Sequence, residues 1–306
     1  PLNPSYKSEE YEFYLKDLNP KIVLVEKNSE NPVVDVAKKL KIELCEINPE
    51  KDGPSGIFNI YEKESEYSLP NENDEALVLH TSGTTSRPKI VPLTNKNIFS
   101  SAENISKSLN LSENDHCLNI MPLFHIHGLI AILASSMKAG ASVCASNGFN
   151  AIKFLDIAKS EKITWYSGVP TMHQTILLRA HKNLEIAKGL ELRLIRSSSA
   201  SLPPAVFNDL NDVFSCPVIE AYGMTEATHQ MTSNPLPPKQ QKAGFVGLPA
   251  GPEVCIMNEN GEVLKQGDEG EVCIKGENVT LGYDNNEEAN KTSFTNGWFR
   301  TGDQGY

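Results

Sequence analysis

Short apolar runs alternate with amphipathic segments along most of this chain, and no other feature constrains its fold as strongly. Between residues 76 and 221, each apolar run has the length of a buried strand, and the intervening segments carry apolar residues at helical spacing. Thr94 and Asn150 precede two of these segments and are residue types that cap helices. The alternation predicts a layered α/β fold with largely parallel sheets flanked by helices.

The same pattern begins near the start of the chain. Residues 22–25 read Ile-Val-Leu-Val and predict a strand, and residues 41–47 predict another. Between them, Asn31 can cap a helix that has Pro32 at its first position. This strand–helix–strand unit predicts a parallel pair joined by a right-handed crossover. Residues 48–74 are rich in Asn, Glu, Ser, Gly and Pro, which predicts a connection dominated by loops.

The pattern changes at residues 234–241, which contain three prolines. Beyond this stretch the helix signals fade, and short strands are expected at residues 253–258, 261–264 and 270–276. Strands of this length, separated by Gly, Asn and Glu, predict a small barrel or meander. We therefore expect an α/β body over residues 1–233 and a β-rich, barrel-like subdomain over residues 234–306.

Composition argues against several classes of function. The chain has 306 residues, a formal net charge of −11 and a calculated pI near 5.2, so it lacks the excess of Lys and Arg expected for binding nucleic acid or an anionic membrane. Six cysteines are scattered without a Cys-x-x-Cys pair, which favours a reducing compartment such as the cytoplasm over a disulfide framework. No apolar run is long enough to span a bilayer, so we expect a soluble protein without membrane insertion.

Residues 80–89 carry the clearest ligand signal, since His-Thr-Ser-Gly-Thr-Thr-Ser-Arg-Pro-Lys follows a predicted strand and precedes a predicted helix. Hydroxyls, backbone N–H groups and one ammonium suit a polyphosphate, whose oxygens need donors from several directions. The stretch is not a Walker loop, because Pro88 precedes Lys89 and Ile90 follows it. The alternative interpretation is a Ser/Thr-rich surface turn.

Two further stretches have side chains that suit a nucleotide. Residues 222–226, Tyr-Gly-Met-Thr-Glu, follow a predicted buried strand and so lie at the carboxyl edge of a parallel sheet, where ligands bind. A single carboxylate such as Glu226 is enough for Mg²⁺, which takes few protein oxygens in addition to phosphates. Asp303, near the end of the chain, has two acceptor oxygens that suit the hydroxyls of a ribose. Taken singly, each stretch could be an ordinary solvated turn.

Four motifs occur in the order typical of one superfamily: residues 81–89, Pro-Leu-Phe-His at 122–125, Tyr-Gly-Met-Thr-Glu at 222–226 and Trp-Phe-Arg-Thr-Gly-Asp at 298–303. With them the chain resembles the adenylate-forming superfamily of acyl-CoA synthetases, luciferases and peptide-synthetase adenylation domains. The resemblance implies two helix-flanked sheets with a distorted barrel, and it implies that ATP, Mg²⁺ and CoA take part. It also implies that the chain is a fragment, without an opening segment and a mobile C-terminal domain, and with little activity of its own. A peroxisomal address could then follow Tyr306, and the sequence indicates no oligomeric state.

The resemblance assigns roles to individual residues. Thr225, Glu226, His125 and Lys89 would be catalytic, and Glu226 would bind the metal. The nucleotide and its phosphates would contact a larger set, made up of Thr81, Ser82, Gly83, Thr84, Thr85, Lys89, Ser199, Ala200, Ser201, Glu220, Ala221, Tyr222, Gly223, Thr225 and Asp303. Ser86 and Ile90 stand where the superfamily usually has glycine, so the phosphate loop is expected to be stiffer here.

The acid substrate is expected to be small and polar. His125 and His127 alternate, but no further ligand at metal spacing accompanies them, so we expect them to serve the acid rather than a metal. By resemblance His125 gates entry of the carboxylate, and His125, His127, Ser199 and His229 would surround the acid. Residues 80–89, 195–202 and 220–237 are most similar to oxalate–CoA ligases. The alternatives are a coumarate- or medium-chain-acyl-CoA ligase and, from another class, a non-catalytic nucleotide-binding relative; the polar residues could also simply face solvent.

Overall fold

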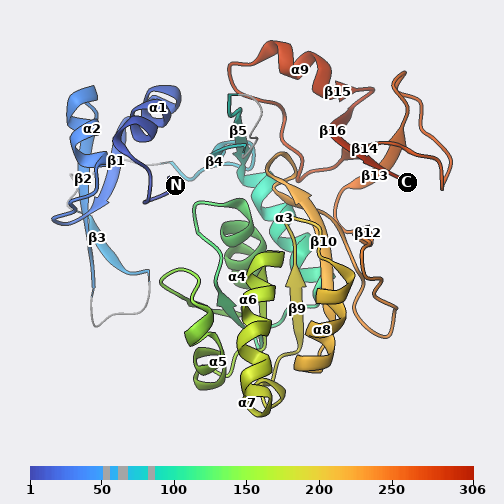
Figure 1. Ribbon diagram of the computed structural model, residues 1–306. Helices are drawn as coiled ribbons and strands as arrows, with labels where there is room; N and C mark the ends of the chain where they lie inside the picture. The colour runs from blue at the N-terminus through green and yellow to red at the C-terminus, as the bar shows by residue number, and fades with distance from the viewer. Residues whose placement is uncertain (51–55, 61–67, 82–86) are drawn as a thin grey trace. The chain divides into compact units, whose positions relative to one another are not determined.

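The structure is a computed structural model that describes residues 1–50, 56–60, 68–81 and 87–306. The chain divides into two compact units, Pro1–Leu69 and Pro70–Tyr306 (Figure 1). Within the described residues, no helix is both long and apolar enough to cross a membrane.

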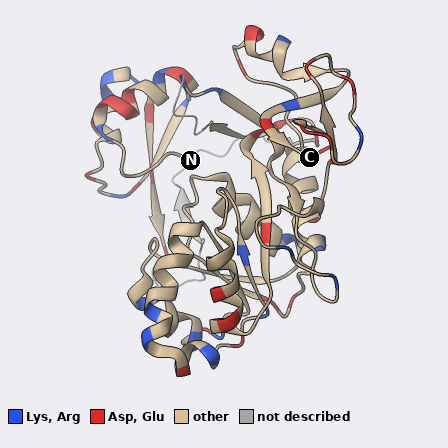
Figure 2. Ribbon diagram, turned by 45° about the vertical axis from the view of Figure 1, so that its right-hand side comes forward, with Lys and Arg blue, Asp and Glu red and all other residues tan. Residues whose placement is uncertain are grey.

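The first unit contains the strand–helix–strand arrangement predicted from the sequence. Strand β1 (Ile22–Glu26) pairs in parallel with β2 (Glu43–Pro49), and helix α2 (Val33–Leu40) connects them. The N-cap of α2 is Pro32 and not Asn31, although Oδ1 of Asn31 accepts a hydrogen bond from the backbone N–H of Val33, the first residue of the helix. Helix α1 (Ser8–Leu18) packs on α2, and β3 (Phe58–Ile60) adds an antiparallel strand to β2. Acidic and basic residues are interspersed on α1 and α2 (Figure 2).

The second unit is built on a seven-stranded sheet. Five parallel strands form its body: β10 (Val218–Met224), β9 (Leu194–Ser197), β8 (Trp165–Gly168), β6 (His116–Asn119) and β7 (Ser142–Ala145), in this spatial order. Next to β10, β11 (His229–Ser233) and β12 (Leu248–Pro249) extend the sheet antiparallel. The prediction of a mainly parallel sheet is therefore confirmed. The domain boundary expected at residue 233 falls between β11 and β12.

Helices flank this sheet, as the alternation predicted. They are α3 (Asn95–Ser108), the π-helix η1 (His127–Ala134), α4 (Ser135–Lys138), α5 (Ala151–Ser160), α6 (Pro170–Ala180), the short η2 (His181–Asn183), α7 (Leu184–Lys188) and α8 (Pro204–Phe214). Thr94 and Asn150 cap α3 and α5 with their side chains. The segment expected to be one α-helix over residues 128–138 instead begins as a π-helix, one residue earlier, and becomes α-helical at Ser135.

Consecutive strand residues enter different cores, because side chains alternate across a sheet. Tyr166 of β8 and Ile195 of β9 join a core with α5, α6 and α8. Their neighbours Trp165 and Leu194 join a second core, on the other face, with α3 and η1. Arg196 lies two residues after Leu194 and so on the same face of β9. Its hydrogen-bonding partners His127 and Gln230 come from η1 and β11.

Two smaller sheets complete the second unit. Strands β4 (Glu75–His80) and β5 (Ile90–Thr94) form an antiparallel pair on either side of the predicted phosphate loop. The antiparallel order β13–β14–β16–β15 joins Glu253–Met257, Gly270–Lys275, Trp298–Gly305 and Phe294–Thr295. Strands expected at 253–258 and 270–276 are confirmed. The strand expected at 261–264 is wrong, since this segment makes only an isolated bridge between Met257 and Val263, and helix α9 (Glu287–Ser293) was not predicted.

Candidate active site

A cavity of about 980 Å³ lies at the carboxyl edge of the parallel sheet, where β9 and β10 end. Eight residues that the sequence analysis assigned to the nucleotide line it: Ser199, Ala200, Ser201, Glu220, Ala221, Tyr222, Gly223 and Asp303. These residues come from three separated segments of the chain, so the fold brings together what the motifs only suggested. Val254 and Ile256 of β13 also line the cavity, which makes it partly apolar. Its size suits a small-molecule ligand.

Tyr222 and Asp303 meet at this cavity, and the hydroxyl of Tyr222 donates a hydrogen bond to Oδ2 of Asp303. Burial and the nearby carboxylate of Asp303 together raise the pKa of Tyr222, so the phenol remains protonated. Asp303 itself is exposed and has a second carboxylate oxygen. The pair thus presents an aromatic ring beside an acceptor, the combination expected around an adenosine.

Local contacts explain why a glutamate stands at position 220 and a glycine at position 223. Oε2 of Glu220 accepts a hydrogen bond of 2.9 Å from the backbone N–H of Gly244, and burial raises the pKa of this carboxyl group. A Cβ at position 223 would overlap the backbone carbonyl of His229, where β10 and β11 approach each other at a register shift. Gly223 is therefore required by the packing of β11 as well as by its position on the cavity wall.

Lys89, Tyr283 and Glu226 form a second group. The Lys89 ammonium lies 4.3 Å from the centre of the Tyr283 ring, and the Tyr283 hydroxyl donates a 2.7 Å hydrogen bond to Oε1 of Glu226. Burial, reinforced by the charge of Glu226, raises the pKa of Tyr283. Glu226 is only 6% exposed and lies in the short helix η3 (Thr225–Ala227), next to Thr225. Two residues expected to be catalytic are thus linked through one aromatic ring.

Strands β4 and β5 hold the two ends of the predicted phosphate loop together. The Thr81 hydroxyl accepts a 3.0 Å hydrogen bond from the backbone N–H of Lys89, and the Thr81 N–H donates to the Lys89 carbonyl at 2.9 Å. Ser82, Gly83, Thr84 and Thr85 lie outside the described residues, as does Ser86, so their roles stay predictions.

The four residues expected to surround the acid are connected through histidine rings. Nδ1 of His127 lies 3.0 Å from the hydroxyl of Ser199, which lines the cavity. The His127 and His229 rings are 4.9 Å apart between centres, and both side chains are buried. His125 is half-buried, and its Nδ1 accepts a 3.1 Å hydrogen bond from the backbone N–H of His127. None of the three histidines is itself on the cavity wall.

Arg196 lies behind these histidines and is 0% exposed. Its Nη2 lies 3.1 Å from Oε1 of Gln230 and 3.5 Å from Nδ1 of His229, and its Nη1 lies 3.4 Å from the hydroxyl of Ser167. Burial lowers the pKa of Arg196 to about 9, so the guanidinium remains charged at neutral pH. Burial, with the charge of Arg196 added, lowers the pKa of His127 and of His229 well below the usual value, so both rings are neutral.

The backbone at this edge of the site is unusual. Ser199 has φ of 71°, Thr228 of 48° and His229 of 92°, all in the left-handed region that residues with a Cβ seldom adopt. Such conformations persist where surrounding contacts enforce them, and they are concentrated at functional sites. Here the side chains of Thr228 and Ser101 fix the turn, since Thr228 Oγ1 donates to the Asn278 carbonyl at 2.7 Å and Ser101 Oγ donates to the Thr228 carbonyl at 2.5 Å.

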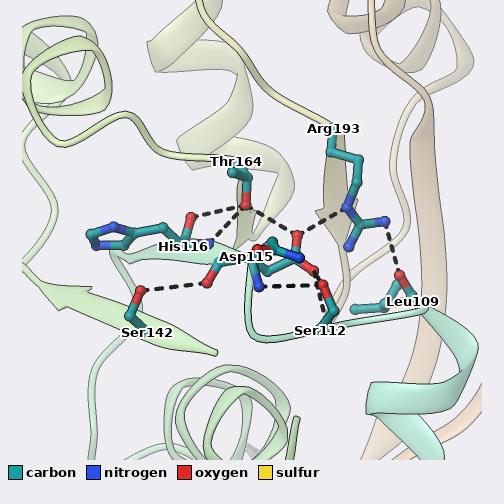
Figure 3. A network of polar contacts seen from close by, with 8 residues as sticks. Leu109, Ser112, Asp115, His116, Ser142, Thr164 and Arg193 are labelled. Atoms are coloured by element: carbon teal, nitrogen blue, oxygen red, sulfur yellow. Dashed lines mark hydrogen bonds and ion pairs between the residues drawn. The ribbon is translucent and has the colours of Figure 1, made fainter. Parts of the chain in front are cut away.

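A separate polar network occupies the amino edge of the same sheet (Figure 3). Asp115 is 4% exposed and accepts hydrogen bonds from Nε of Arg193 at 2.9 Å, from the Thr164 hydroxyl at 3.1 Å and from the Ser112 N–H at 2.9 Å. Arg193 also donates to the carbonyl of Leu109 at 3.0 Å. These residues tie the starts of β6, β8 and β9 to the end of α3. Their position, at the edge opposite the cavity, assigns them a structural role.

Sequence reasoning missed four residues of the site, namely Ser167, Arg196, Gln230 and Tyr283. Arg196 and Gln230 lie in the segments 195–202 and 220–237 that carry the resemblance, and these two side chains do not face solvent, since both are buried. The sequence held one signal for Arg196: side chains alternate along a strand, so Arg196 lies on the same face of β9 as the apolar Leu194. Ser167 and Tyr283 carry no comparable signal in the sequence.

Comparison with known proteins agrees with this geometry. The AMP-binding enzyme family matches residues 1–284. An oxalate–CoA ligase of Arabidopsis thaliana is 48% identical over 316 residues, covering all of this chain and 61% of that protein. An oxalate–CoA ligase of Saccharomyces cerevisiae is 42% identical over 334 residues, with the same coverage of this chain and 61% of its own length.

Among solved structures, O-succinylbenzoate coenzyme A synthetase (MenE) of Bacillus subtilis, in complex with ATP and magnesium ion, is similar with a TM-score of 0.81 at 28% identity. The match covers all of this chain and 60% of that one, so this chain spans about 60% of the length of its relatives. The fold, the four motifs and these matches agree: the chain belongs to the AMP-binding enzyme family.

Proposed function

We propose that the protein containing this chain is an AMP-forming acid–CoA ligase that uses ATP, Mg²⁺ and CoA, and that its acid is oxalate. Family membership and two oxalate–CoA ligases among the relatives support the proposal. The observation that carries the choice of acid is the buried polar cluster behind Ser199, formed by His127, His229 and Arg196.

The reaction has two steps. An oxygen of the acid attacks the α-phosphorus of ATP, the bond to the β-phosphate breaks, and pyrophosphate leaves. The CoA sulfur then attacks the acyl carbon, the bond to AMP breaks, and the thioester forms. The main barrier to the first step is repulsion between anions, so the protein must position the reactants and offset their charge.

The described residues provide groups for these tasks. Lys89 supplies a positive charge at one end of the phosphate loop, where the β- and γ-phosphates are expected. Thr225 adds a hydroxyl next to Glu226 for the α-phosphate. Tyr222 would flank the adenine ring and Asp303 would accept hydrogen bonds from the ribose hydroxyls, and both residues line the cavity. The acid would lie beside Ser199, which lines the cavity.

Glu226 fits the role of magnesium ligand. It is buried, and its Oε1 is fixed by the hydroxyl of Tyr283, while a carboxylate has several lone pairs for further partners. Mg²⁺ is usually held by one or two carboxylates together with substrate phosphates, so a single glutamate is sufficient. When bound, the ion supplies positive charge that offsets the phosphate oxygens.

The acid pocket favours a second anionic group. Ser199 lines the cavity, His127 contacts Ser199 at 3.0 Å, and His229 lies within 4.9 Å of the His127 ring. Removing a carboxylate from water is costly unless several donors meet it, and an apolar acid would leave these buried donors unpaired. Oxalate has the required second carboxylate and is short enough to bring it close to Ser199 when the first carboxylate reacts.

The test is ATP–pyrophosphate exchange by the full-length protein with oxalate, acetate, hexanoate and coumarate. We expect the highest kcat/KM for oxalate, by about 10⁴-fold over hexanoate, as for sites built around a polar group. His229→Ala should lower kcat/KM for oxalate more than it changes the KM for ATP, and Ser199→Val should shift the preference towards monocarboxylates. A wild-type preference for hexanoate or coumarate would refute oxalate as the acid.

A further inference from the structure

Arg196 is a buried cation without an anionic partner. In the part of the chain that the structure describes, ion pairs of arginine join Arg193 to Asp115 and Arg300 to Glu271, and no carboxylate pairs with Arg196. Its Nε also has no hydrogen-bond partner among these residues. A buried charge is expensive unless it is paired, so an unpaired arginine in a fold of this kind points to an anion that binds nearby.

The hydrogen bonds of Arg196 have a fixed direction, because a guanidinium only donates. Nη1 donates to the hydroxyl oxygen of Ser167 at 3.4 Å, so the Ser167 hydrogen is directed to its other neighbour, Nε2 of His127, at 2.6 Å. Nη1 also lies 3.5 Å from the same Nε2. Nε2 of His127 is therefore an acceptor, and the proton of this neutral ring is on Nδ1.

The hydrogen bonds between His127 and the cavity follow the same donor-to-acceptor order. Nδ1–H of His127 donates to Oγ of Ser199 at 3.0 Å. Once its oxygen accepts this bond, Ser199 has its own hydrogen available for a group inside the cavity that it lines. Arg196, Ser167, His127 and Ser199 thus form a donor chain that begins at a buried positive charge and ends at the cavity wall.

A second branch from Arg196 orients His229. Nη2 of Arg196 lies 3.5 Å from Nδ1 of His229, which must be the acceptor, so the proton of this neutral ring is on Nε2. That Nε2 is buried and has no partner among the described residues. Gln230 anchors the guanidinium from the other side, since its Oε1 accepts from Nη2 at 3.1 Å and its Nε2 donates to the carbonyl of Ala250 at 3.0 Å.

We propose that Arg196 is a positioning residue that selects for a small dianionic acid by orienting two donors for its distal anionic group: the Ser199 hydroxyl on the cavity wall and the buried Nε2–H of His229 behind that wall. The inference rests on the proposed function and deepens it, because it assigns the origin of the acid preference to a residue behind the cavity. The charge of Arg196 adds a long-range attraction for the anion, which is strengthened by the low dielectric of its surroundings.

Arg193 shows what a purely structural arginine looks like in the same strand region. It pairs with Asp115 and holds a carbonyl of α3 at the amino edge of the sheet (Figure 3). Arg196 has histidine, serine and glutamine partners instead, at the edge that carries the cavity. Arg193 is therefore the matched control.

The first test measures which ring nitrogen of His127 and of His229 carries the proton, and it needs no variant of Arg196. In the full-length protein labelled with ¹⁵N-histidine, NMR should show His127 protonated on Nδ1 and His229 on Nε2, with the signals assigned through His127→Gln and His229→Gln. A wild-type protein with His127 protonated on Nε2, or His229 on Nδ1, would overturn the proposed direction of the chain.

The second test separates the acid from the nucleotide. Arg196→Met should raise the KM for oxalate at least about tenfold, in line with the loss of hydrogen bonds to a charged group, and leave the KM for ATP unchanged. Arg196→Lys should recover part of the loss, because it restores the charge. Arg193→Met should lower the melting temperature without changing the ratio of oxalate to acetate kcat/KM.

The outcomes distinguish the inference from the proposed function. If wild-type protein activates oxalate and Arg196→Met retains its KM for oxalate, the role of Arg196 is wrong while the ligase assignment stands. If wild-type protein shows the expected histidine protons but no exchange dependent on oxalate, the proposed function fails and the donor chain stands. Equal losses in Arg196→Met and Arg193→Met, in both oxalate and ATP constants, would reduce Arg196 to a structural residue.

Discussion

Glu226 and Lys89 contact the same tyrosine, yet we expect their removal to have different effects. Glu226→Ala removes the carboxylate that we propose as the metal ligand, so kcat should fall on the order of 100-fold and the Mg²⁺ concentration for half-maximal rate should rise. Lys89→Ala should cost less and leave the Mg²⁺ requirement unchanged, because the Thr81 hydroxyl accepts the N–H of residue 89 and keeps its own hydrogen for a phosphate oxygen. Titration of Mg²⁺ against rate in the full-length protein measures both effects.

Tyr283→Phe is the control for this pair. It keeps the ring beneath Lys89 and removes only the 2.7 Å hydrogen bond to Glu226, so the rate should change by less than about fivefold. Similar losses in Glu226→Ala and Lys89→Ala, with an unchanged metal requirement in both, would contradict the roles given to them.

At the residue scale, motifs predicted the cavity wall better than the groups behind it. Ser199, Tyr222 and Asp303 were found because each stands in a recognisable stretch, and all three line one cavity. The contacts behind the wall join residues that are far apart in the chain: Ser167 and Arg196 are separated by 29 residues, and Glu226 and Tyr283 by 57. Such pairs depend on strand register and helix placement, which local patterns do not determine.

At the scale of elements, the π-helix η1 positions His127 at its first residue. Gly128 follows, and a Cβ there would overlap the carbonyl oxygen of Pro122. Gly128→Ala should therefore destabilise the protein by about 1–3 kcal/mol, the usual cost of inserting an atom into a packed site, and should lower kcat/KM for oxalate because His127 moves. Urea denaturation and the exchange assay measure the two effects.

Met137 in α4 provides a control from the next turns of the same helical segment. Its side chain is 69% exposed, so Met137→Ala should change the free energy of unfolding by no more than about 0.5 kcal/mol. A Gly128→Ala variant as stable and active as wild type would show that Pro122 yields without disturbing His127.

The elements that the sequence predicted share a clear local signal. The caps at Thr94 and Asn150 and the strand–helix–strand unit with β1 and β2 are confirmed, because each depends on residues close together in the chain. The π-helix was not foreseen, since an apolar run such as residues 127–134 does not distinguish i→i+4 from i→i+5 bonding. Residues 261–264 looked like a strand, but they meet β13 only at the isolated bridge between Met257 and Val263, whereas β13 forms its regular ladder with β14.

At the scale of the whole molecule, three fully buried histidines link stability to pH. Burial lowers the pKa of His173 to about 4 and those of His127 and His229 well below 6.5, whereas the unfolded chain takes up these protons near 6.5. The unfolded state then binds more protons, so the stabilisation is complete above pH 6.5 and is lost as the pH falls towards the folded pKa values. Each group contributes a slope of up to about 1.4 kcal/mol per pH unit.

Denaturation in urea at pH 7.5, 6.5 and 5.5 tests this expectation. The free energy of unfolding should fall on acidification. Glu220, whose pKa is raised by burial, adds stability as the pH falls, but it is one group against three histidines. His173→Gln removes one of the three contributions and should make the slope smaller. A free energy of unfolding that does not change between pH 7.5 and 5.5 would contradict the neutral, buried state of these rings.

The unpaired guanidinium of Arg196 also restricts how the acid preference of this protein could change during evolution. A larger apolar acid would require apolar residues in place of His229 or Gln230, but each such replacement removes an acceptor from a charge that stays buried. Apolar substitutions at positions 229 and 230 would therefore be tolerated only if Arg196 is lost first or at the same time. The same substitution of His229 should be harmful when Arg196 is present and neutral when Arg196 has been replaced.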